Sequence, residues 1–363
     1  MTKLPINLSL RMGSSTDIIS ERERFVLNAI VENFVKNATP IGSRYLAKKS
    51  STTMSPATIR NVMMDLEELG YVTQPHTSAG RIPTDKGYRF YVDSLMPVEL
   101  LSEQEKQHII EQLRGVSQGV DTILEAASQV LARVSSQLGV VLSPHFYRGI
   151  FEKMELVPIA DKKILMVLFI KQGLVKTITM EITATISREV LEKTARIINE
   201  RLHGLSLQEI KKSVDQRMRD IGDADTDLIK LMIDAADVVF SEDERRRFHF
   251  GGTNNIISQP EFTDYQQLAN VLNLLESREI LVHLFEQSGD REKISITIGE
   301  ENREELIKHC SLITTTYNLG HIRGTLGVLG PTRIRYAKMV ALVDFMAKIL
   351  TQLLEEHHQV TKS

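Results

Sequence analysis

Apolar residues near the start of the chain recur at helical spacing between residues that begin and end helices. Ser20 and Glu23 have the S-x-x-E spacing of a capping box, in which each side chain binds the backbone N–H of the other residue. The periodic residues that follow predict a helix that ends before Pro40, since a proline ring disfavours helical geometry at the residue before it. These residues are Leu27, Ile30, Val31 and Phe34.

Two further helices are expected next. A short one over 43–49 offers Tyr45 and Leu46 for burial. The other begins at Ser55, a preferred N-cap residue, with Pro56 at the first helical position. Its inward stripe consists of Ile59, Val62, Met63, Leu66 and Leu69.

A hairpin is predicted after this helix. Gly70 can end the helix in the left-handed conformation, and residues 71–74 have the composition of a strand. Turn-forming residues at 75–80 lead to a returning strand at 81–83, and Thr84 can cap a further helix. The order of three helices followed by a hairpin is that of a winged helix-turn-helix.

The rest of the chain mixes strands and helices. Ser187 opens one helix, and Pro331 is expected to start a long final helix. Strands at both ends with helices between them predict an α+β domain interrupted by an insertion. The predicted strands lie at 138–142, 151–157, 164–170, 175–182, 294–298, 311–317 and 324–329.

Composition indicates an ordinary globular protein of two or three domains, with 363 residues, 42% hydrophobic and 25% charged. The single cysteine, Cys310, excludes an internal disulfide and fits a reducing compartment. The start of the chain does not resemble a signal peptide, and the longest strongly apolar run, 164–170, is far shorter than the roughly 20 residues of a membrane span. A cytoplasmic protein that does not bind membranes is expected.

Charge is distributed unevenly. The net charge is −3, yet residues 33–64 contain no Asp or Glu. A locally basic stretch in a mildly acidic chain favours one polyanion-binding face, although chance clustering on a solvated surface remains open. The basic residues in this stretch are Lys36, Arg44, Lys48, Lys49 and Arg60.

The helix that begins at Ser55 has the composition of a recognition helix, which enters the major groove and meets base edges with its N-terminal residues. Arginine can bind guanine, asparagine can bind adenine, and alanine can contact a thymine methyl group. A winged helix that binds protein instead of DNA is the alternative. The predicted contacts are Ala57, Arg60 and Asn61 to bases, Ser55 and Thr58 to phosphate, Arg44, Lys48 and Lys49 to the backbone, and His76, Thr77, Ser78 and Arg81 from the wing.

Three stretches carry a specific resemblance. Residues 55–71 read SPATIRNVMMDLEELGY, residues 74–89 read QPHTSAGRIPTDKGYR, and residues 324–333 read GTLGVLGPTR, with Tyr336 following. They resemble the recognition helix, the wing and the C-terminal signature of the HrcA family, which are bacterial heat-inducible transcription repressors. Because the motifs lie at both ends, the resemblance covers essentially the whole chain.

The resemblance implies a homodimer that represses chaperone operons at an inverted-repeat DNA operator called CIRCE, with activity that depends on the GroEL chaperonin. It also implies a GAF-like α+β body interrupted by an inserted dimerising domain. The expected segments are a flexible tail at 1–19, the winged-helix DNA-binding domain at 20–96, the GAF-like domain at 101–220 and 293–363, and the inserted dimerising domain at 221–292.

Other patterns do not indicate an enzyme, and neither a cofactor nor a metal is expected. Gly324, Gly327 and Gly330 match no nucleotide-binding spacing and favour turns and close packing. Cys310 beside His309 lacks an orienting third group, which favours a packed cysteine.

Three alternatives stay open. The apolar stripe at 228–239 fits a core or a dimer interface, and the basic run at 245–247 fits an inter-domain contact better than nucleic acid. The alternative function is a ligand-gated winged-helix regulator that senses a small molecule in the GAF-like domain.

Overall fold

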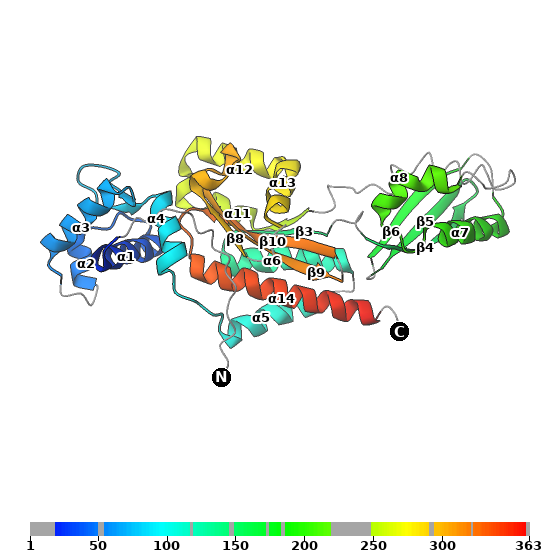
Figure 1. The fold of residues 1–363 in the computed structure, drawn as a ribbon, viewed down its shortest axis with the longest axis horizontal. Coiled ribbons are helices and arrows are strands. Elements are labelled where there is room, and N and C mark those ends of the chain that lie inside the picture. The colour runs from blue at the N-terminus through cyan, green and yellow to red at the C-terminus, as the bar shows by residue number, and fades with distance from the viewer. Residues whose placement is uncertain are drawn as a thin grey trace.

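The computed structural model describes residues 19–49, 54–116, 119–144, 149–171, 174–182, 186–218, 248–289, 294–320 and 322–360. The described chain is elongated and has three parts (Figure 1). We call residues 19–95 the head, the five-stranded sheet with its helices the body, and residues 149–218 the distal unit. The head and the distal unit lie at opposite ends of the body.

The head begins with α1 (Glu21–Asn37), α2 (Ser43–Lys49) and α3 (Pro56–Glu68). The predicted capping box is confirmed, because the Ser20 N–H donates to the Glu23 carboxylate at 2.5 Å and the Glu23 N–H donates to the Ser20 hydroxyl at 3.3 Å. The helices share one apolar core, which stabilises the head as a unit. Its fully buried residues include Leu27, Ile30, Leu46, Ile59 and Leu66.

The wing is the short antiparallel hairpin of β1 (Val72–Thr73) and β2 (Ile82–Pro83). Gly70 adopts the left-handed conformation expected at the end of α3, with a φ of 77°. A Cβ atom on Gly80 would lie 2.3 Å from the carbonyl carbon of Ile41, so only glycine permits this close approach. The predicted winged helix-turn-helix is therefore confirmed.

A helix links the wing to the body. Thr84 caps α4 (Asp85–Phe90), as predicted, by accepting the Gly87 N–H at 3.1 Å. The helix continues as a π-helical turn, η1 (Tyr91–Leu95).

The body is built on an antiparallel five-stranded sheet in the order β7-β3-β10-β9-β8. One face packs on α6 and α14, with α5 packed against them, and the other face packs on α12 and α13 (Figure 1). Alternate side chains of a strand point to opposite faces, so each strand contributes to both layers. The strands are β3 (Leu138–Leu142), β7 (Phe248–Gly251), β8 (Ser295–Ile298), β9 (Cys310–Leu319) and β10 (Ile322–Pro331).

The helices of the body come from three stretches of the chain. The first face is covered by α5 (Glu103–Arg114), α6 (Val120–Ser135) and α14 (Tyr336–Val360). The second carries α11 (Thr253–Ile257), α12 (Tyr265–Glu276) and α13 (Arg278–Gly289). A short 3-10 turn, η5 (Pro260–Thr263), connects α11 to α12, and two others, η6 (Gly299–Glu301) and η7 (Glu305–Ile307), lie between β8 and β9. None of the helices in this described part of the chain has the length and apolar character of a membrane span.

The distal unit has its own sheet and its own core. Its antiparallel strands lie in the order β4-β5-β6, and two helices cover one face. The elements are β4 (Phe151–Ala160), β5 (Lys163–Ile170), β6 (Leu174–Glu181), α7 (Arg188–Leu202) and α8 (Leu207–Met218).

The separate unit lies earlier in the chain than expected. The sequence indicated an insertion at 221–292, but the described helices of that range, within 253–289, pack on the body sheet. The segments 219–247 and 290–293, with the apolar stripe at 228–239 and the basic run at 245–247, lie outside the described residues, as do residues 1–18. Periodicity identifies strands but not which strands share a sheet, and this explains the displaced boundary.

The predicted strands are confirmed, with two differences nearby. β7 was not predicted, because its Phe-His-Phe-Gly sequence follows a charged run. The final helix begins at Tyr336 rather than at Pro331, because β10 continues to Pro331, opposite Cys310. Proline is tolerated at such a strand end.

Candidate nucleic-acid interface

The two faces of α3 differ sharply in burial. Its inward face packs on α1 and α2 through Ile59, Val62, Met63 and Leu66, all buried. Leu69 was expected on this face but is 40% exposed, because it is the C-cap residue that follows the last turn. The outward residues Ala57, Arg60, Asn61 and Met64 are all exposed. A helix held by one apolar stripe presents the remaining face to a groove.

The start of α3 is set by its cap. The Ser55 hydroxyl accepts the Thr58 N–H at 3.1 Å and lies 2.9 Å from the Thr58 hydroxyl. Ser55 is exposed, whereas Thr58 is half-buried. The positive end of the helix dipole makes this terminus a favourable place for a phosphate.

Basic side chains on α2 extend the same part of the head, with Arg44 and Lys48 both exposed. Tyr45, which was expected to be buried, is 37% exposed because its hydroxyl belongs to a polar cluster instead. The Lys49 ammonium donates to that hydroxyl at 2.6 Å, and the amide of Asn37 donates to it at 3.2 Å. The hydrogen bond from Lys49 lowers the pKa of Tyr45. The cluster places the Lys49 ammonium beside the Tyr45 hydroxyl, on the surface of α2.

The tip of the wing is bridged by the Gln74 side chain and open to solvent. The Gln74 amide donates to the carbonyls of Thr77 and Ala79, both at 2.9 Å. His76, Thr77 and Ser78 are exposed around this bridge. Short polar side chains on an exposed loop suit contacts to a DNA backbone.

Arg81 is placed apart from these residues. Its guanidinium pairs with Glu67 of α3 at 2.7 Å, and the Arg81 side chain is only 15% exposed. The Arg81 backbone also exchanges two hydrogen bonds of 2.9 Å with Ile41. Arg81 therefore ties the wing to α3 and to the start of α2, and it is not presented to solvent with the wing tip.

The other residues predicted to contact DNA lie on α2, on α3 and at the tip of the wing. α2 and α3 pack on each other, and Figure 1 places them at the end of the molecule farthest from the distal unit. Sequence reasoning missed the polar role of Tyr45, although its position four residues before Lys49 on a helix was a usable signal.

Other candidate chemistry finds no support in the described residues. Burial raises the pKa of the Cys310 thiol to about 12, which keeps it protonated and confirms a packed cysteine. Gly324 and Gly327 lie within β10, where a Cβ atom would meet the Tyr317 ring at 2.3 Å or the Ile313 carbonyl at 2.2 Å. Close packing accounts for them. Among the described residues, no cluster of three His, Cys, Asp or Glu side chains is placed to hold a metal ion.

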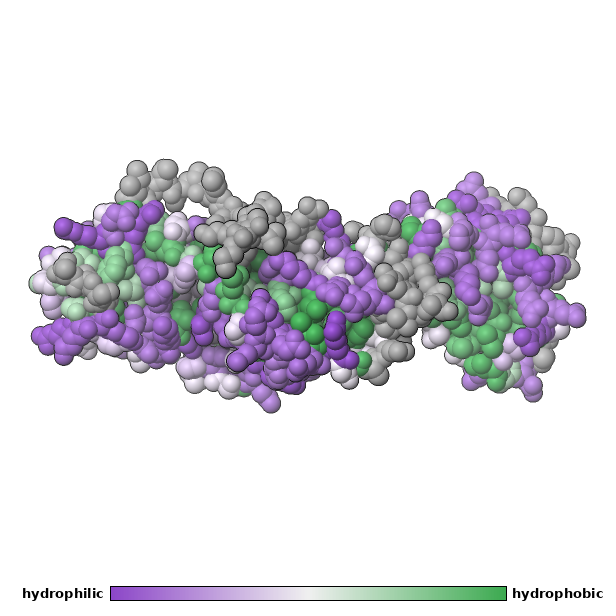
Figure 2. Space-filling model, turned by 90° about the horizontal axis from the view of Figure 1, so that it is seen from below, coloured by the Kyte–Doolittle hydropathy of each residue, from purple (hydrophilic) through white to green (hydrophobic). Residues whose placement is uncertain are grey.

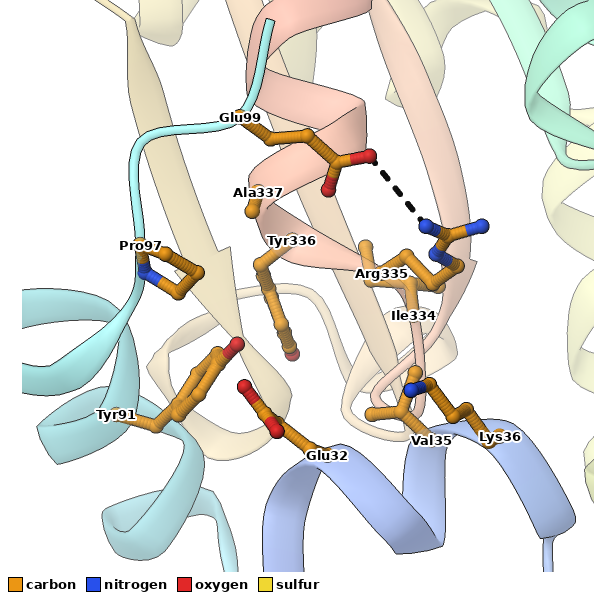
Figure 3. Close-up of a pocket in the computed structure, with 10 residues that line it drawn as sticks. All are labelled: Glu32, Val35, Lys36, Tyr91, Pro97, Glu99, Ile334, Arg335, Tyr336 and Ala337. Atoms are coloured by element: carbon orange, nitrogen blue, oxygen red, sulfur yellow. Dashed lines mark hydrogen bonds and ion pairs between the residues drawn. The ribbon is translucent and has the colours of Figure 1, made fainter. Parts of the chain in front are cut away.

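A cavity of about 170 Å³ lies between the head and the body (Figure 3). Glu32 of α1 and Tyr91 of η1 point into it from the head, while Arg335 and Tyr336 line it from the body. Burial, followed by the charges of Glu32 and Glu99, raises the pKa of Tyr91 to about 12.

Comparison with known proteins agrees with this architecture. Residues 18–94 match the family described as the winged helix-turn-helix transcription repressor, HrcA DNA-binding. Residues 121–340 match the HrcA protein C terminal domain. A solved structure of a hypothetical protein shares the fold, with a TM-score of 0.62 at 21% identity over 94% of this chain and 100% of that chain.

Two relatives illustrate the similarity. The heat-inducible transcription repressor HrcA of Chlorobium phaeobacteroides (strain BS1) is 40% identical over 93% of this chain and 98% of the relative. The protein of the same name from Halalkalibacterium halodurans is 34% identical over 94% of this chain and 99% of the relative. The chain, an α+β multidomain protein with an N-terminal winged helix, therefore belongs to the HrcA family of heat-inducible transcription repressors.

Proposed function

We propose that this protein represses heat-shock chaperone operons by binding, as a dimer, to an inverted-repeat operator of the CIRCE type. The observation that carries the proposal is the outward face of α3, where Arg60 and Asn61 are exposed opposite a fully packed stripe. Arginine binds guanine and asparagine binds adenine through paired hydrogen bonds in the major groove. Ala57 beside them suits a thymine methyl group.

Contacts to phosphate set the register of α3 in the groove. Arg44 and Lys48 of α2 and Ser55 at the start of α3 supply them on one side, and His76 and Ser78 of the wing tip supply them on the other. Such contacts position a protein on DNA without reading its sequence. Arg81 acts indirectly, because its pair with Glu67 holds the wing against α3.

A footprint of the full chain on DNA that contains the inverted repeat tests this function. Two protected half-sites are expected on one face of the duplex, about one helical turn or a multiple of it apart. Protection that ignores the repeat would contradict the proposal.

Lys48→Ala should weaken binding to operator and random DNA alike. A lysine that neutralises one phosphate releases about one counterion, so the slope of log affinity against log salt should fall by about one. The slope is measured by titrating labelled duplexes at several salt concentrations. Lys212→Ala, which removes an exposed lysine of the distal unit, is the matched control. An unchanged slope for Lys48→Ala would show that Lys48 does not contact a phosphate.

The dimer is proposed to form through the distal unit, which we assign as the insertion that interrupts a GAF-like body. One face of its sheet packs on α7 and α8, whereas Val157 and Val175 on the other are 41% and 51% exposed. Leu165, Val167 and Phe169 of β5 lie between them on the same face. Figure 2 shows apolar residues gathered over this unit. An open sheet face with an apolar row along its central strand, flanked by polar residues such as Lys153 and Glu155, suits pairing with its two-fold copy.

Val167→Lys should convert the dimer into monomers. Val167 lies at the centre of the open face, opposite Glu155 and Thr177, and a dimer would bury two new charges there. Light scattering of the full chain measures the mass. Gln208→Lys adds the same charge on an exposed position of α8 and should leave the mass unchanged. A dimeric Val167→Lys protein would place the interface elsewhere.

Dependence on the GroEL chaperonin is proposed from family membership. Operator affinity measured with and without chaperonin tests this part separately, and a gain with chaperonin is expected. The alternative is a ligand-gated regulator. The cavity in Figure 3 lies at the head–body junction rather than inside the body, and a metabolite screen by thermal shift would test whether it binds one.

A further inference from the structure

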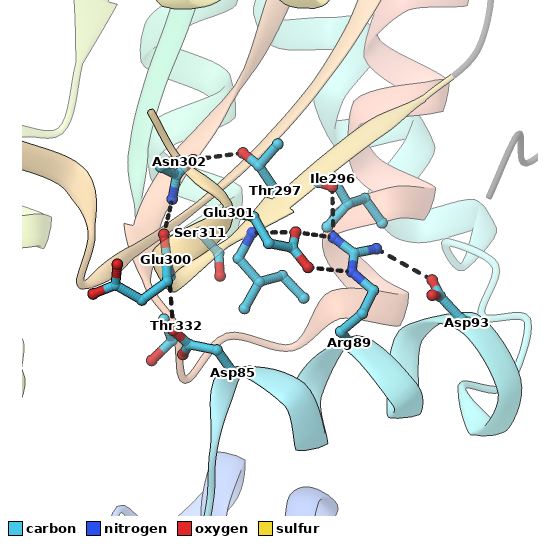
Figure 4. Close-up of polar contacts among 12 residues, drawn as sticks. Asp85, Arg89, Asp93, Ile296, Thr297, Glu300, Glu301, Asn302, Ser311 and Thr332 are labelled. Carbon is cyan, nitrogen blue, oxygen red and sulfur yellow. Dashed lines mark hydrogen bonds and ion pairs between the residues drawn. The ribbon is translucent and has the colours of Figure 1, made fainter. Parts of the chain in front are cut away.

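The head is fastened to the body by the side chain of Arg89 on α4 (Figure 4). Its guanidinium binds both carboxylate oxygens of Glu301, with the Nε–Oε1 distance at 2.7 Å. It also donates to the Ile296 carbonyl at 2.7 Å and to Asp93 at 3.2 Å. The Arg89 side chain is only 24% exposed. A two-pronged pair that also binds a backbone carbonyl fixes direction as well as distance.

A second contact lies one turn earlier on the same helix. The Asp85 carboxylate accepts the Glu300 N–H at 2.9 Å (Figure 4). Gly299 has a φ of 54°, and a Cβ atom there would lie 1.8 Å from the Asp85 carboxylate. Asp85 and Arg89 are four residues apart and therefore share a face of α4. Together they hold the turn η6 of the body.

Two further contacts join the head to the body, one through α1 and one through α4. Arg333, which also pairs with Glu261, donates to the Val35 carbonyl near the end of α1 at 3.0 Å. The rings of Tyr88 and Tyr336 pack with centroids 5.8 Å apart. The head is thus docked on the body through α1 and α4 and is not merely tethered by the segment that follows it.

We propose that Arg89 and Glu301 are positioning residues for operator recognition. They fix the orientation of the head, and therefore of α3, relative to the body. The inference rests on the proposed function, since it concerns how two heads of a dimer meet two half-sites. A single head that binds a single half-site does not need a fixed orientation relative to the body. Two heads bound together gain from a high effective concentration only when their geometry matches the spacing of the half-sites. Loosening the junction should therefore weaken binding to the repeat and spare binding to a half-site.

Glu301→Gln tests the proposal in the full chain, because it removes the charge and keeps the shape. Affinity is measured on the inverted repeat, on a single half-site and on a repeat with an altered spacer. We expect about a tenfold or greater loss on the native repeat, no loss on the half-site and less discrimination between spacers. Arg89→Lys, which keeps the charge but not the fork, should fall between this variant and the native protein. Glu192→Gln breaks an exposed pair with Arg188 on α7 and should change nothing.

Equal losses on the repeat and on the half-site would overturn the proposal, as would unchanged affinity for the repeat. Hydrogen exchange in the same variant supplies a readout independent of DNA. Faster exchange is expected in α4 and residues 299–302, with α3 unchanged, and faster exchange throughout the head would mean that Glu301 serves only stability. A native protein that does not distinguish the repeat from a scrambled duplex would refute the proposed function itself, before any variant is made.

Discussion

Asn61→Ala should reduce discrimination between the operator and other sequences by about 1–3 kcal/mol, which corresponds to a loss of roughly fivefold to 140-fold. Asn61 is exposed on the outward face of α3, next to Arg60, for which the same loss is expected. Affinity for the operator and for a random duplex is measured by fluorescence anisotropy at one salt concentration. The operator should lose affinity, and the random duplex should not.

Lys48→Ala is the contrasting variant, because a phosphate contact should cost both duplexes equally. Equal losses of Asn61→Ala on both duplexes would show that Asn61 touches the backbone or supports the head, and would refute its base-reading role. If Asn61→Ala stops discriminating between bases at a single position of each half-site, that position identifies the base that Asn61 reads.

Leu66→Ala should destabilise the head by about 2–5 kcal/mol, since it leaves a cavity in a packed core. Leu66 of α3 is fully buried in the core of the head, where α3 packs on α1 and α2. Hydrogen exchange of α1 and α3 in the full chain measures the loss, with about a tenfold faster exchange for each 1.4 kcal/mol. DNA binding should fall with it, because α3 would no longer be held.

Leu69→Ala is the matched control, as it makes the same substitution in the next turn at a position that is 40% exposed. Its exchange should stay close to that of the native protein. A comparable loss at Leu69 would mean that Leu69 contributes to the packed face of α3 as Leu66 does.

The head was predictable because its determinants are local. The capping box at Ser20, the cap at Ser55 and the left-handed Gly70 each act within a few residues, and their structures follow the sequence pattern. The wing needs one longer contact, in which Gly80 lets the hairpin approach Ile41. Even this contact joins residues of the same small domain.

The division of the body was not predictable in the same way. β3 pairs with β10 and with β7, across more than a hundred residues of chain, whereas β4 pairs with its neighbour β5. Strand patterns alone do not reveal such partners, so the separate unit was expected at 221–292 instead of 149–218. Apolar spacing cannot distinguish a helix that covers a sheet from one that forms a unit of its own.

The candidate site shows the same limit. Residue type suggested DNA contact for Arg81 and burial for Tyr45, but residue type does not show which partners set the position of each side chain. Arg81 forms an ion pair with Glu67 between the wing and α3. Lys49 and Asn37 donate hydrogen bonds to the Tyr45 hydroxyl at the surface. Arg89 gave no signal in the sequence, because Glu301 lies in a distant part of the chain.

The central claim is that α3 reads a defined DNA sequence from a dimer. Anisotropy titration of the full chain onto an inverted-repeat duplex and a scrambled duplex, at one near-physiological salt concentration, tests it most directly. A preference of about a thousandfold or more for the repeat is expected of a specific binder. Equal and weak binding to both duplexes, unchanged when chaperonin is added, would contradict the claim and favour a head that binds protein or a regulator that awaits a ligand.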